Sequence, residues 1–345
     1  MPLFNQPQNR KRGFYLALIA SMLAIVVVGL GAFTRLKHAG LGCPDWPGCY
    51  GHVWAPQADH EIARANEAYP TMPVQLDKTW PEMVHRYFAG GLVLMTLAIV
   101  ALAIKYRHRP AQPLKLPIFI FLFIVLQALF GMWTVTLKLW PQIVTLHLLG
   151  GFTMLSSLWL LTLRLNNQCW RLPDRTLVSV SSLRRFAVFG LLLVIAQICL
   201  GGWTTSNYAA LACPDFPTCQ QQWWPVMDFS DGFNLLQHIG PNYLGGMMDN
   251  SARVAIHFSH RVGAVAVTLY LAFLIWKLCT QFALPETRRI AIVIAAILIA
   301  QLCLGVSNIV FNFPLAVAVT HNLVGALLLL ALVTLNHRVF TAQPL

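Results

Sequence analysis

Four histidines lie inside long apolar segments, at positions that repeat between the two halves of the chain. They are His85, His147, His260 and His321. Ionisable side chains inside a membrane are costly and usually functional. In each half, one histidine belongs to the second apolar segment and one to the fourth, each roughly 5–10 Å from the outer end of its predicted helix. Two facing imidazoles at equal depth are what a six-coordinate iron porphyrin needs, and helical bundles build such sites in their cores.

Two alternative roles for these histidines remain open. Each ring could simply form a hydrogen bond to a neighbouring helix, although the paired and repeated arrangement favours a common function. A zinc site is the second possibility, but zinc requires three or four compact ligands, and only two histidines recur in each half. The sequence therefore favours a heme iron bound by two axial histidines in each half.

The two halves differ three residues before the histidine of their second segment. Glu82 precedes His85, whereas His257 precedes His260, and a spacing of three puts both groups on one helix face. A carboxylate at a porphyrin edge could accept a proton or stabilise a developing cation. Alternatively, Glu82 could lie at a helix N-terminus, where the helix dipole favours negative charge. The difference between the halves favours a catalytic Glu82, and no role is assigned to His257.

Both halves contain the pattern Cys-Pro-Asp-aromatic-Pro-x-Cys in a segment predicted to lie outside the membrane. The pairs are Cys43 with Cys49 and Cys213 with Cys219. Thiols oxidise outside the inner membrane, and the short prolyl segment between each pair can close a small loop, so we expect a disulfide in each. Such a disulfide could staple the long loop over a heme opening, or the cysteines could exchange electrons or thiols during turnover.

Three arginines lie close to these groups. Arg86 and Arg261 directly follow a histidine, and Arg35 ends the first apolar segment. A guanidinium group can bind a carboxylate through two hydrogen bonds, and a b-type heme has two propionates, so all three are candidates for propionate binding. Snorkelling of these long side chains to the membrane interface is the alternative.

The composition defines the elements that must position these residues. Apolar residues make up 57% of the chain and charged residues only 10%, whereas about a quarter of a soluble domain is charged. Apolar blocks of about 20 residues, long enough to span a bilayer, recur along the chain. We therefore predict an all-α integral membrane protein with eight transmembrane helices. The predicted spans are about 13–33, 82–104, 116–136, 142–163, 186–205, 254–276, 290–311 and 315–335.

The distribution of charge predicts the topology. The net charge is +12, and most Lys and Arg residues fall on one side if both termini are cytoplasmic, as the positive-inside rule requires. This favours a membrane protein over a nucleic-acid-binding one. The first apolar segment is too long for a cleavable signal peptide, and no Arg- and Ser-rich transit segment precedes it. We therefore expect the inner (plasma) membrane of a bacterium.

The chain also contains an internal repeat. Residues 30–49 match residues 200–219 at an offset of 170, and Gln127, Gly131 and His147 recur at an offset of 174. Each unit has four spans, so both copies enter the membrane from the same side, as parallel repeats do. We predict two tandem parallel four-helix bundles, an N-terminal unit over 1–165 and a C-terminal unit over 186–345, joined by a cytoplasmic linker over 166–185.

These motifs resemble the heme A synthase family. The resemblance rests on Gly31–Cys49, Glu82–Arg86 and Thr145–His147, and in the second half on His257–Arg261 and Thr320–Asn322. It covers nearly the whole chain. It implies oxidation of a methyl group of heme O to a formyl group by two successive hydroxylations, which gives heme A for terminal oxidases.

The resemblance also implies a role for each site. His85 and His147 would bind the substrate heme O beside Glu82, whereas His260 and His321 would ligate heme b, which relays electrons. The cysteine pair of the first half would be the one required for activity. Heme O synthase and a membrane electron donor are the expected partners besides lipid, and a homo-oligomer is compatible with the sequence.

Three alternative functions remain. A di-heme b-type cytochrome that only moves electrons explains the four histidines but not Glu82 or the cysteine loops. A thiol oxidoreductase leaves the histidines inside the membrane without a role. A transporter built on parallel repeats predicts no bound heme.

Overall fold

The computed structural model describes residues 10–282 and 284–344, and most of this part of the chain is helical. The first group of helices is α1 (Phe14–Leu36), α2 (Asp59–Ala68), α3 (Leu76–Lys105), α4 (Lys115–Thr136) and α5 (Pro141–Asn166). The second group is α6 (Asp174–Ser206), α7 (Phe229–Gly232), α8 (Asn250–Thr280), α9 (Pro285–Val310) and α10 (Leu315–Phe340). The two-residue strands β1 (Arg171–Leu172) and β2 (Gln343–Pro344) form a parallel pair.

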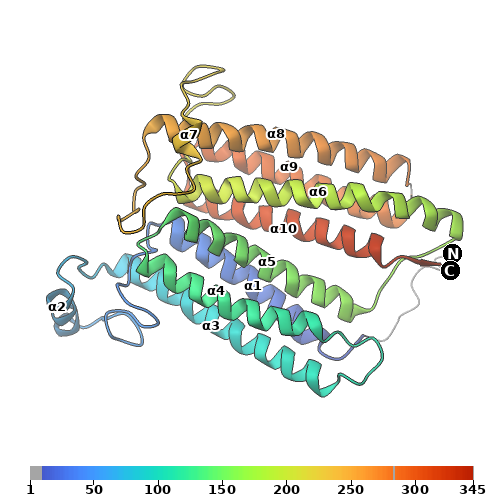
Figure 1. The fold of residues 1–345 in the computed structure, drawn as a ribbon, viewed down its shortest axis with the longest axis horizontal. Coiled ribbons are helices and arrows are strands. Elements are labelled where there is room, and N and C mark those ends of the chain that lie inside the picture. Colours follow the sequence, from blue (N-terminus) through green and yellow to red (C-terminus); the bar gives the residue numbers. More distant parts are fainter. Residues whose placement is uncertain (1–9, 283, 345) are drawn as a thin grey trace.

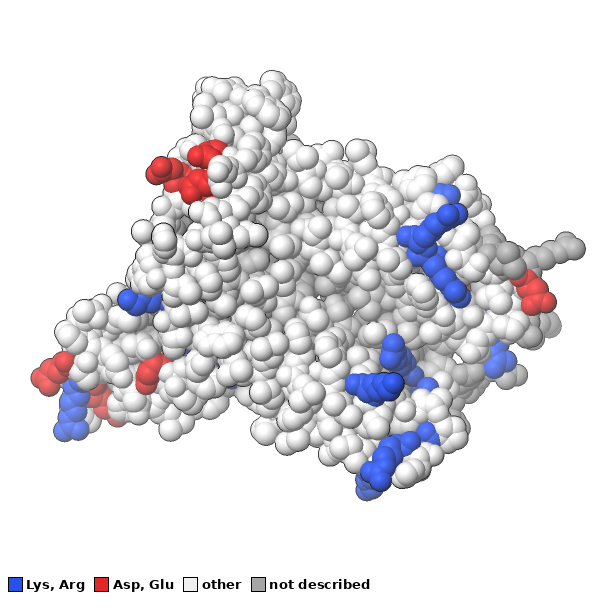
Figure 2. All heavy atoms as spheres, in the orientation of Figure 1, with Lys and Arg blue, Asp and Glu red and all other residues white. Residues whose placement is uncertain are grey.

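Within the described residues, eight helices are long and apolar enough to cross a membrane, which confirms the predicted class. They are α1, α3–α6 and α8–α10. Many of their large apolar side chains are exposed, for example Leu94, Leu122 and Leu269. Such a surface is compatible with lipid but not with water. In Figure 2, charged residues gather at the two ends of the visible face and leave its middle uncharged. The protein is therefore a multi-pass membrane protein.

Two helices begin well before their predicted spans. Helix α3 starts at Leu76 rather than at residue 82, and α6 starts at Asp174 rather than at residue 186. Apolar runs mark the part of a helix inside the bilayer, whereas backbone hydrogen bonds continue the same helix into the polar zone. Most of the predicted linker over 166–185 is therefore the first part of α6, and only residues 167–173 separate α5 from α6.

The eight long helices form two groups that pack side by side (Figure 1). In the first half, α1 contacts α3 and α5, and α4 contacts the same two helices. In the second half, α6 contacts α8 and α10, and α9 contacts the same two. The halves meet where the first helix of each contacts the last helix of the other, α1 with α10 and α6 with α5, and where α5 meets α10. The two repeats thus have matching helix contacts.

Small residues bring the two halves together. Gly29 on α1 packs against Leu323 on α10, where a Cβ atom would lie 3.4 Å from the leucine side chain. Gly202 on α6 packs in the same way against Thr145 and Leu148 on α5. Close approach of this kind is how helices associate in membranes, where burial of apolar surface supplies little driving force. Both contacts lie within a few residues of a predicted iron ligand.

Candidate functional site

The structure places the four histidines in two pairs, one in each half. His85 on α3 and His147 on α5 are close enough to interact electrostatically, and so are His260 on α8 and His321 on α10. In each half, the two helices that present the histidines both pack against the other two helices of that half. The sequence repeat therefore corresponds to a repeated arrangement in space.

Each imidazole ring lies against a glycine of a neighbouring helix. The pairs are His85 with Gly31, His147 with Gly131, His260 with Gly201 and His321 with Gly305. A Cβ atom on any of these glycines would lie 3.0 to 3.5 Å from the Cε1 atom of its histidine. At Gly31, Gly201 and Gly305 these distances are tighter than ordinary van der Waals contact, so a larger residue would push the ring away, whereas the 3.5 Å at Gly131 is an ordinary contact. The first and third helices of each half thus provide the surface against which the rings pack.

The ring nitrogens fit a heme better than a zinc ion. The Nδ1 atoms of His85, His147 and His321 are buried without a hydrogen-bond partner in the protein. Among the described residues, no group of three or more His, Cys, Asp or Glu side chains could hold a metal ion. Zinc requires such a group, whereas a six-coordinate heme iron needs only two axial side chains. The paired imidazoles therefore suit a porphyrin.

Two glutamines contact the histidines of the second half. The amide Nε2 of Gln197 on α6 lies 3.0 Å from His260 Nδ1 and donates to the His260 carbonyl over 2.9 Å. The amide Nε2 of Gln301 on α9 lies 3.2 Å from His321 Nε2. The repeat had identified Gln301 without a role, whereas Gln197 was missed. A lone polar residue inside an apolar segment was the only signal that could have indicated it.

The first half lacks the counterpart of Gln197. At the repeat offset of 170, Val27 occupies this position in α1. The amide of Gln197 lies where a Cβ atom of Gly263 on α8 would be, and the equivalent residue of α3 is Phe88. These two differences between the halves depend on each other, because the Gln197 side chain occupies space that a phenylalanine in place of Gly263 would fill. His260 therefore has a side-chain amide neighbour, whereas the equivalent residue Val27 offers His85 only its backbone.

Both predicted disulfides are present. Cys43–Cys49 closes the first disulfide loop (residues 43–49), and Cys213–Cys219 closes the second (residues 213–219). In the first loop, the Asp45 carboxylate accepts backbone hydrogen bonds from residues 50 and 51 over 2.6 and 2.7 Å. Asp215 accepts from residues 220 and 221 in the same way. The two loops share one internal hydrogen-bond pattern.

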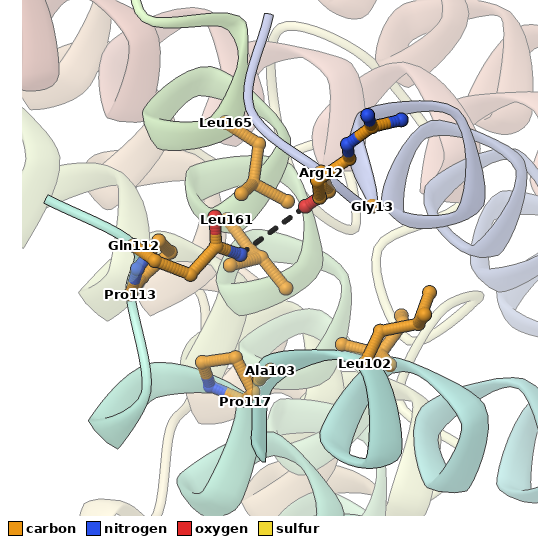
Figure 3. Close-up of a pocket in the computed structure, with 10 residues that line it drawn as sticks. Arg12, Gly13, Leu102, Ala103, Gln112, Pro113, Pro117, Leu161 and Leu165 are labelled. Carbon is orange, nitrogen blue, oxygen red and sulfur yellow. Dashed lines mark hydrogen bonds between the residues drawn. The ribbon is translucent and has the colours of Figure 1, made fainter. Parts of the chain in front are cut away.

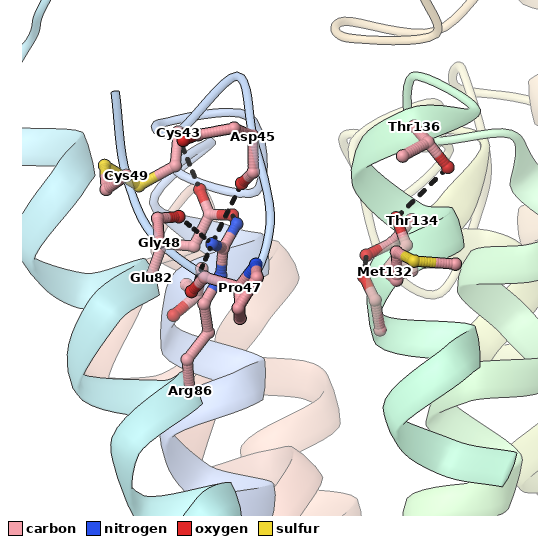
Figure 4. A network of polar contacts seen from close by, with 12 residues as sticks. Cys43, Asp45, Pro47, Gly48, Cys49, Glu82, Arg86, Met132, Thr134 and Thr136 are labelled. Carbon is pink, nitrogen blue, oxygen red and sulfur yellow. Dashed lines mark hydrogen bonds and ion pairs between the residues drawn. A yellow bond between two sulfur atoms is a disulfide. The ribbon is translucent and has the colours of Figure 1, made fainter. Parts of the chain in front are cut away.

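Glu82 is buried beneath the first disulfide loop (Figure 4). Its Oε2 atom accepts a hydrogen bond from the backbone N–H of Cys43 over 3.0 Å, and its Oε1 atom pairs with Arg86 Nη2 over 2.5 Å. Asp77 occupies the first turn of α3, and Glu82 lies nearly two turns into that helix. The helix dipole acts mainly within the first turn, so it does not account for the carboxylate at this position.

Arg86 joins Glu82 to the first disulfide loop. Its Nη1 atom donates to the backbone carbonyls of Asp45, Pro47 and Gly48 over 3.0, 3.2 and 2.5 Å (Figure 4). The carboxylate, the guanidinium group and the disulfide loop therefore form one network. Because charge-assisted hydrogen bonds are the stronger ones, this network fixes where the carboxylate lies.

The second half keeps the arginine and replaces the carboxylate. Arg261 donates to the carbonyls of Cys213, Asp215 and Thr218 over 2.9, 2.8 and 2.7 Å. His257, at the position equivalent to Glu82, is buried with its Nδ1 atom 3.0 Å from the Ala209 carbonyl. The ring nitrogen is the donor in this contact. His257 therefore contributes a hydrogen bond to a loop carbonyl but no negative charge.

The observed contacts of the arginines are with the protein itself. Arg86 and Arg261 bind the disulfide loops, and Arg35 donates to the Tyr208 hydroxyl over 2.5 Å and to the Thr205 carbonyl over 2.7 Å. Arg35 on α1 thereby links the first half to the end of α6. Their assignment to heme propionates stays a prediction.

Two hollows lie at the other end of the helices, away from the histidines. One, of about 10 Å³, lies between the start of α1, the ends of α3 and α5 and the start of α4, and Gln112 donates to the Arg12 carbonyl across it (Figure 3). It has room for about one water molecule. The second, of about 210 Å³, is lined by residues of the α5–α6 connection, α9 and α10. Neither belongs to the histidine sites.

Fold and site together define a multi-pass helical membrane protein with two matching pairs of histidines. The profile of the family of cytochrome oxidase assembly proteins matches residues 14–333, and the chain belongs to this family. It is 44% identical to a heme A synthase of Shewanella oneidensis, over 94% of this chain and 95% of that relative. It is also 25% identical to a heme A synthase of Halalkalibacterium halodurans, over 90% and 91% of the two chains. These matches confirm the resemblance that the motifs indicate.

Proposed function

We propose that this protein is a heme A synthase, an oxidoreductase that oxidises the methyl group of heme O to a formyl group. The observation that carries the proposal is the asymmetry between two otherwise matching histidine pairs. Among the residues that the structure describes, only the first pair has a buried carboxylate nearby, held by Arg86 and the Cys43 amide. A protein that only transfers electrons between two hemes has no use for this difference.

In this proposal, the first half binds the substrate. His85 and His147 hold heme O from both faces, and the glycines behind their rings set the ring positions. Two successive hydroxylations, each of which requires an external oxidant that supplies oxygen, would convert the methyl group into a geminal diol, which would lose water to give the aldehyde. Glu82 accepts a proton or stabilises positive charge that develops at the substrate edge. Arg86 keeps the carboxylate in position, because it binds Glu82 and the first disulfide loop together.

The second half would hold the cofactor. His260 and His321 would ligate heme b, which would supply one-electron transfer to the first half. The amide of Gln197 lies against both the His260 ring and the His260 carbonyl, and this contact would restrict rotation of the ring. Contacts such as Thr145 Oγ1 with Ser206 Oγ, at 2.8 Å, keep the two halves in register close to His147. Arg35, Arg86 and Arg261 are proposed to approach the propionates.

The proposed location is the inner membrane of a bacterium, with both termini in the cytoplasm. The basic residues at the end of the molecule that carries the termini support this orientation (Figure 2). The disulfides then face the oxidising side. Heme O synthase and a membrane electron donor are the proposed partners, and a homo-oligomer is compatible with the exposed apolar surface.

The experiment is to purify the protein from cells that make heme O and to identify its extracted pigments. A heme A synthase should carry heme b together with heme O or heme A. Heme b alone at two per chain, without conversion of heme O, would instead identify a di-heme cytochrome. In the Glu82→Ala variant, heme A formation should be lost while heme b is retained. If heme A formation survives unchanged, the catalytic assignment of Glu82 is wrong.

A further inference from the structure

The segment that follows the second disulfide carries an exposed apolar surface. We call Phe216, Trp223, Trp224 and Val226 the apolar tip, and their exposed fractions are 52%, 74%, 72% and 77%. The sequence from residue 216 to residue 227 contains no charged residue. In Figure 1, the connection between α6 and α8 projects sideways beyond α8, and in Figure 2 this projection is uncharged. Such a surface is unfavourable in water.

The contacts of Arg261 set the depth of this segment along α8. Roughly 19 residues separate Arg261 from Thr280 at the inner end of the helix, which corresponds to about 28 Å at 1.5 Å per residue. The hydrocarbon core of a bilayer is about 30 Å thick. Because Arg261 binds three carbonyls of the second disulfide loop, that loop lies where the hydrocarbon core meets the headgroups.

The polar groups of the loop are used on its inner side. The loop carbonyls accept from Arg261, and the Asp215 carboxylate accepts from backbone N–H groups and from the Thr218 hydroxyl. The Trp224 ring packs edge-on against Phe258 of α8, with ring centroids 5.3 Å apart. Trp224 therefore lies beside α8, and the exposed residues of this segment include Gln221 and Gln222, which are polar but uncharged.

We propose that the apolar tip inserts into the boundary between headgroups and acyl chains, in the leaflet opposite to the chain termini, so that its partner is the lipid bilayer. The depth of the second disulfide loop, the absence of charge from residue 216 to residue 227 and the two tryptophans all support this position. Tryptophan concentrates at membrane interfaces. Arg261 adjoins His260, so the inserted tip fixes the depth of the histidine end of α8.

The equivalent positions of the first half carry a smaller apolar surface, in which Trp46 and Val53 are 39% and 81% exposed. Val53 and Trp54 occupy the positions of Trp223 and Trp224, and Trp54 packs against Tyr87, whose hydroxyl donates to the Val53 carbonyl. The chain then continues into α2, which starts with Asp59 and Glu61. These charges favour contact of the first outer loop with water, so we expect weaker membrane insertion of the first half.

Tryptophan fluorescence of the full-length protein in vesicles tests the proposal. The difference between the wild-type and W223F/W224F spectra isolates the two tip residues. The spectra are recorded in vesicles of dioleoyl phosphatidylcholine. Quenching is measured with the dibrominated analogue of this lipid and, separately, with aqueous iodide. The matched control is the W54F difference spectrum from the first half. If the double variant is not recovered folded, W223F alone serves, since this ring is the more exposed of the two.

We expect the W223F/W224F difference to be strongly quenched by brominated lipid and protected from iodide. The W54F difference should be quenched less by lipid. Strong iodide quenching without lipid quenching would place the tip in water and overturn the proposal. Protection from both quenchers, with a smaller oligomer for W223S/W224S in detergent, would also overturn it, because the tip would then contact a second copy of the chain.

Discussion

The two halves of this protein share a scaffold and differ at the groups beside it. Each half has two histidines, a glycine behind each ring, and an arginine that holds a disulfide loop. The first half adds Glu82 where the second has His257, and the second adds Gln197 where the first has Val27. In our proposal, the repeated part holds heme, and the differences near the rings assign one half to chemistry and the other to a stably bound cofactor.

The largest expected effect comes from two single variants, each of which removes one proposed axial ligand from a different half. His260→Ala should lose the resident heme b, and with it most of the b-type absorbance of the purified protein, since the iron loses one of its two protein ligands. His147→Ala should keep that absorbance and lose heme A formation. Absorption spectra and pigment extraction measure both. Equal loss of heme b in the two variants would contradict the division of labour.

Replacement of the two equivalent arginines by alanine should destabilise the protein by different amounts. Arg86→Ala should cost about 3–5 kcal/mol, because it leaves the buried Glu82 carboxylate without its partner. Arg261→Ala removes hydrogen bonds to carbonyls only and should cost about 1.5–3 kcal/mol. Thermal unfolding in detergent compares the two. The double variant Arg86→Ala/Glu82→Gln should recover part of the loss, and no recovery would show that the ion pair is not the cause.

The glutamine beside His260 offers a finer comparison. Gln197→Val makes the second half resemble the first and should weaken heme b binding about 10- to 100-fold, as removal of a hydrogen-bonding neighbour of a metal-bound histidine typically does. Heme titration of the purified apoprotein measures the affinity, and redox titration should show a changed midpoint potential. Gln112→Val, at the opposite end of the helices, is the control. Equal affinity of the Gln197→Val variant and the wild type would contradict the positioning role.

The smallest expected effect concerns pH and the second disulfide loop. The Thr218 hydroxyl, together with the backbone N–H groups of Gln221 and Gln220, lowers the pKa of Asp215 below its ordinary value. The ionised carboxylate therefore stabilises the folded loop above the ordinary aspartate pKa, and this contribution is lost as the pH falls through the lowered value. Hydrogen exchange at residues 220 and 221 should increase relative to the intrinsic rate in acid. In Asp215→Asn, this dependence should disappear.

The sequence alone was sufficient for the parts of this protein that leave a pattern along the chain. Eight apolar runs predicted eight helices, because a bilayer requires a fixed length of apolar residues. The repeat paired His85 with His260 and His147 with His321, and the cysteine spacing predicted both disulfides. The helix starts were less accurate, because hydropathy reports the bilayer boundary and not the end of the backbone hydrogen bonds.

Only the tertiary structure decided which groups touch. The contacts of Arg86 with three loop carbonyls, of Gln197 with His260 and of Glu82 with the Cys43 amide join residues far apart in the chain. Backbone carbonyls and amides carry no residue identity, so a side chain that binds them leaves no motif. The sequence predicted two histidine sites with a carboxylate beside the first of them. Packing determined that this carboxylate is buried beneath the first disulfide loop and that a glutamine contacts His260 in the second site.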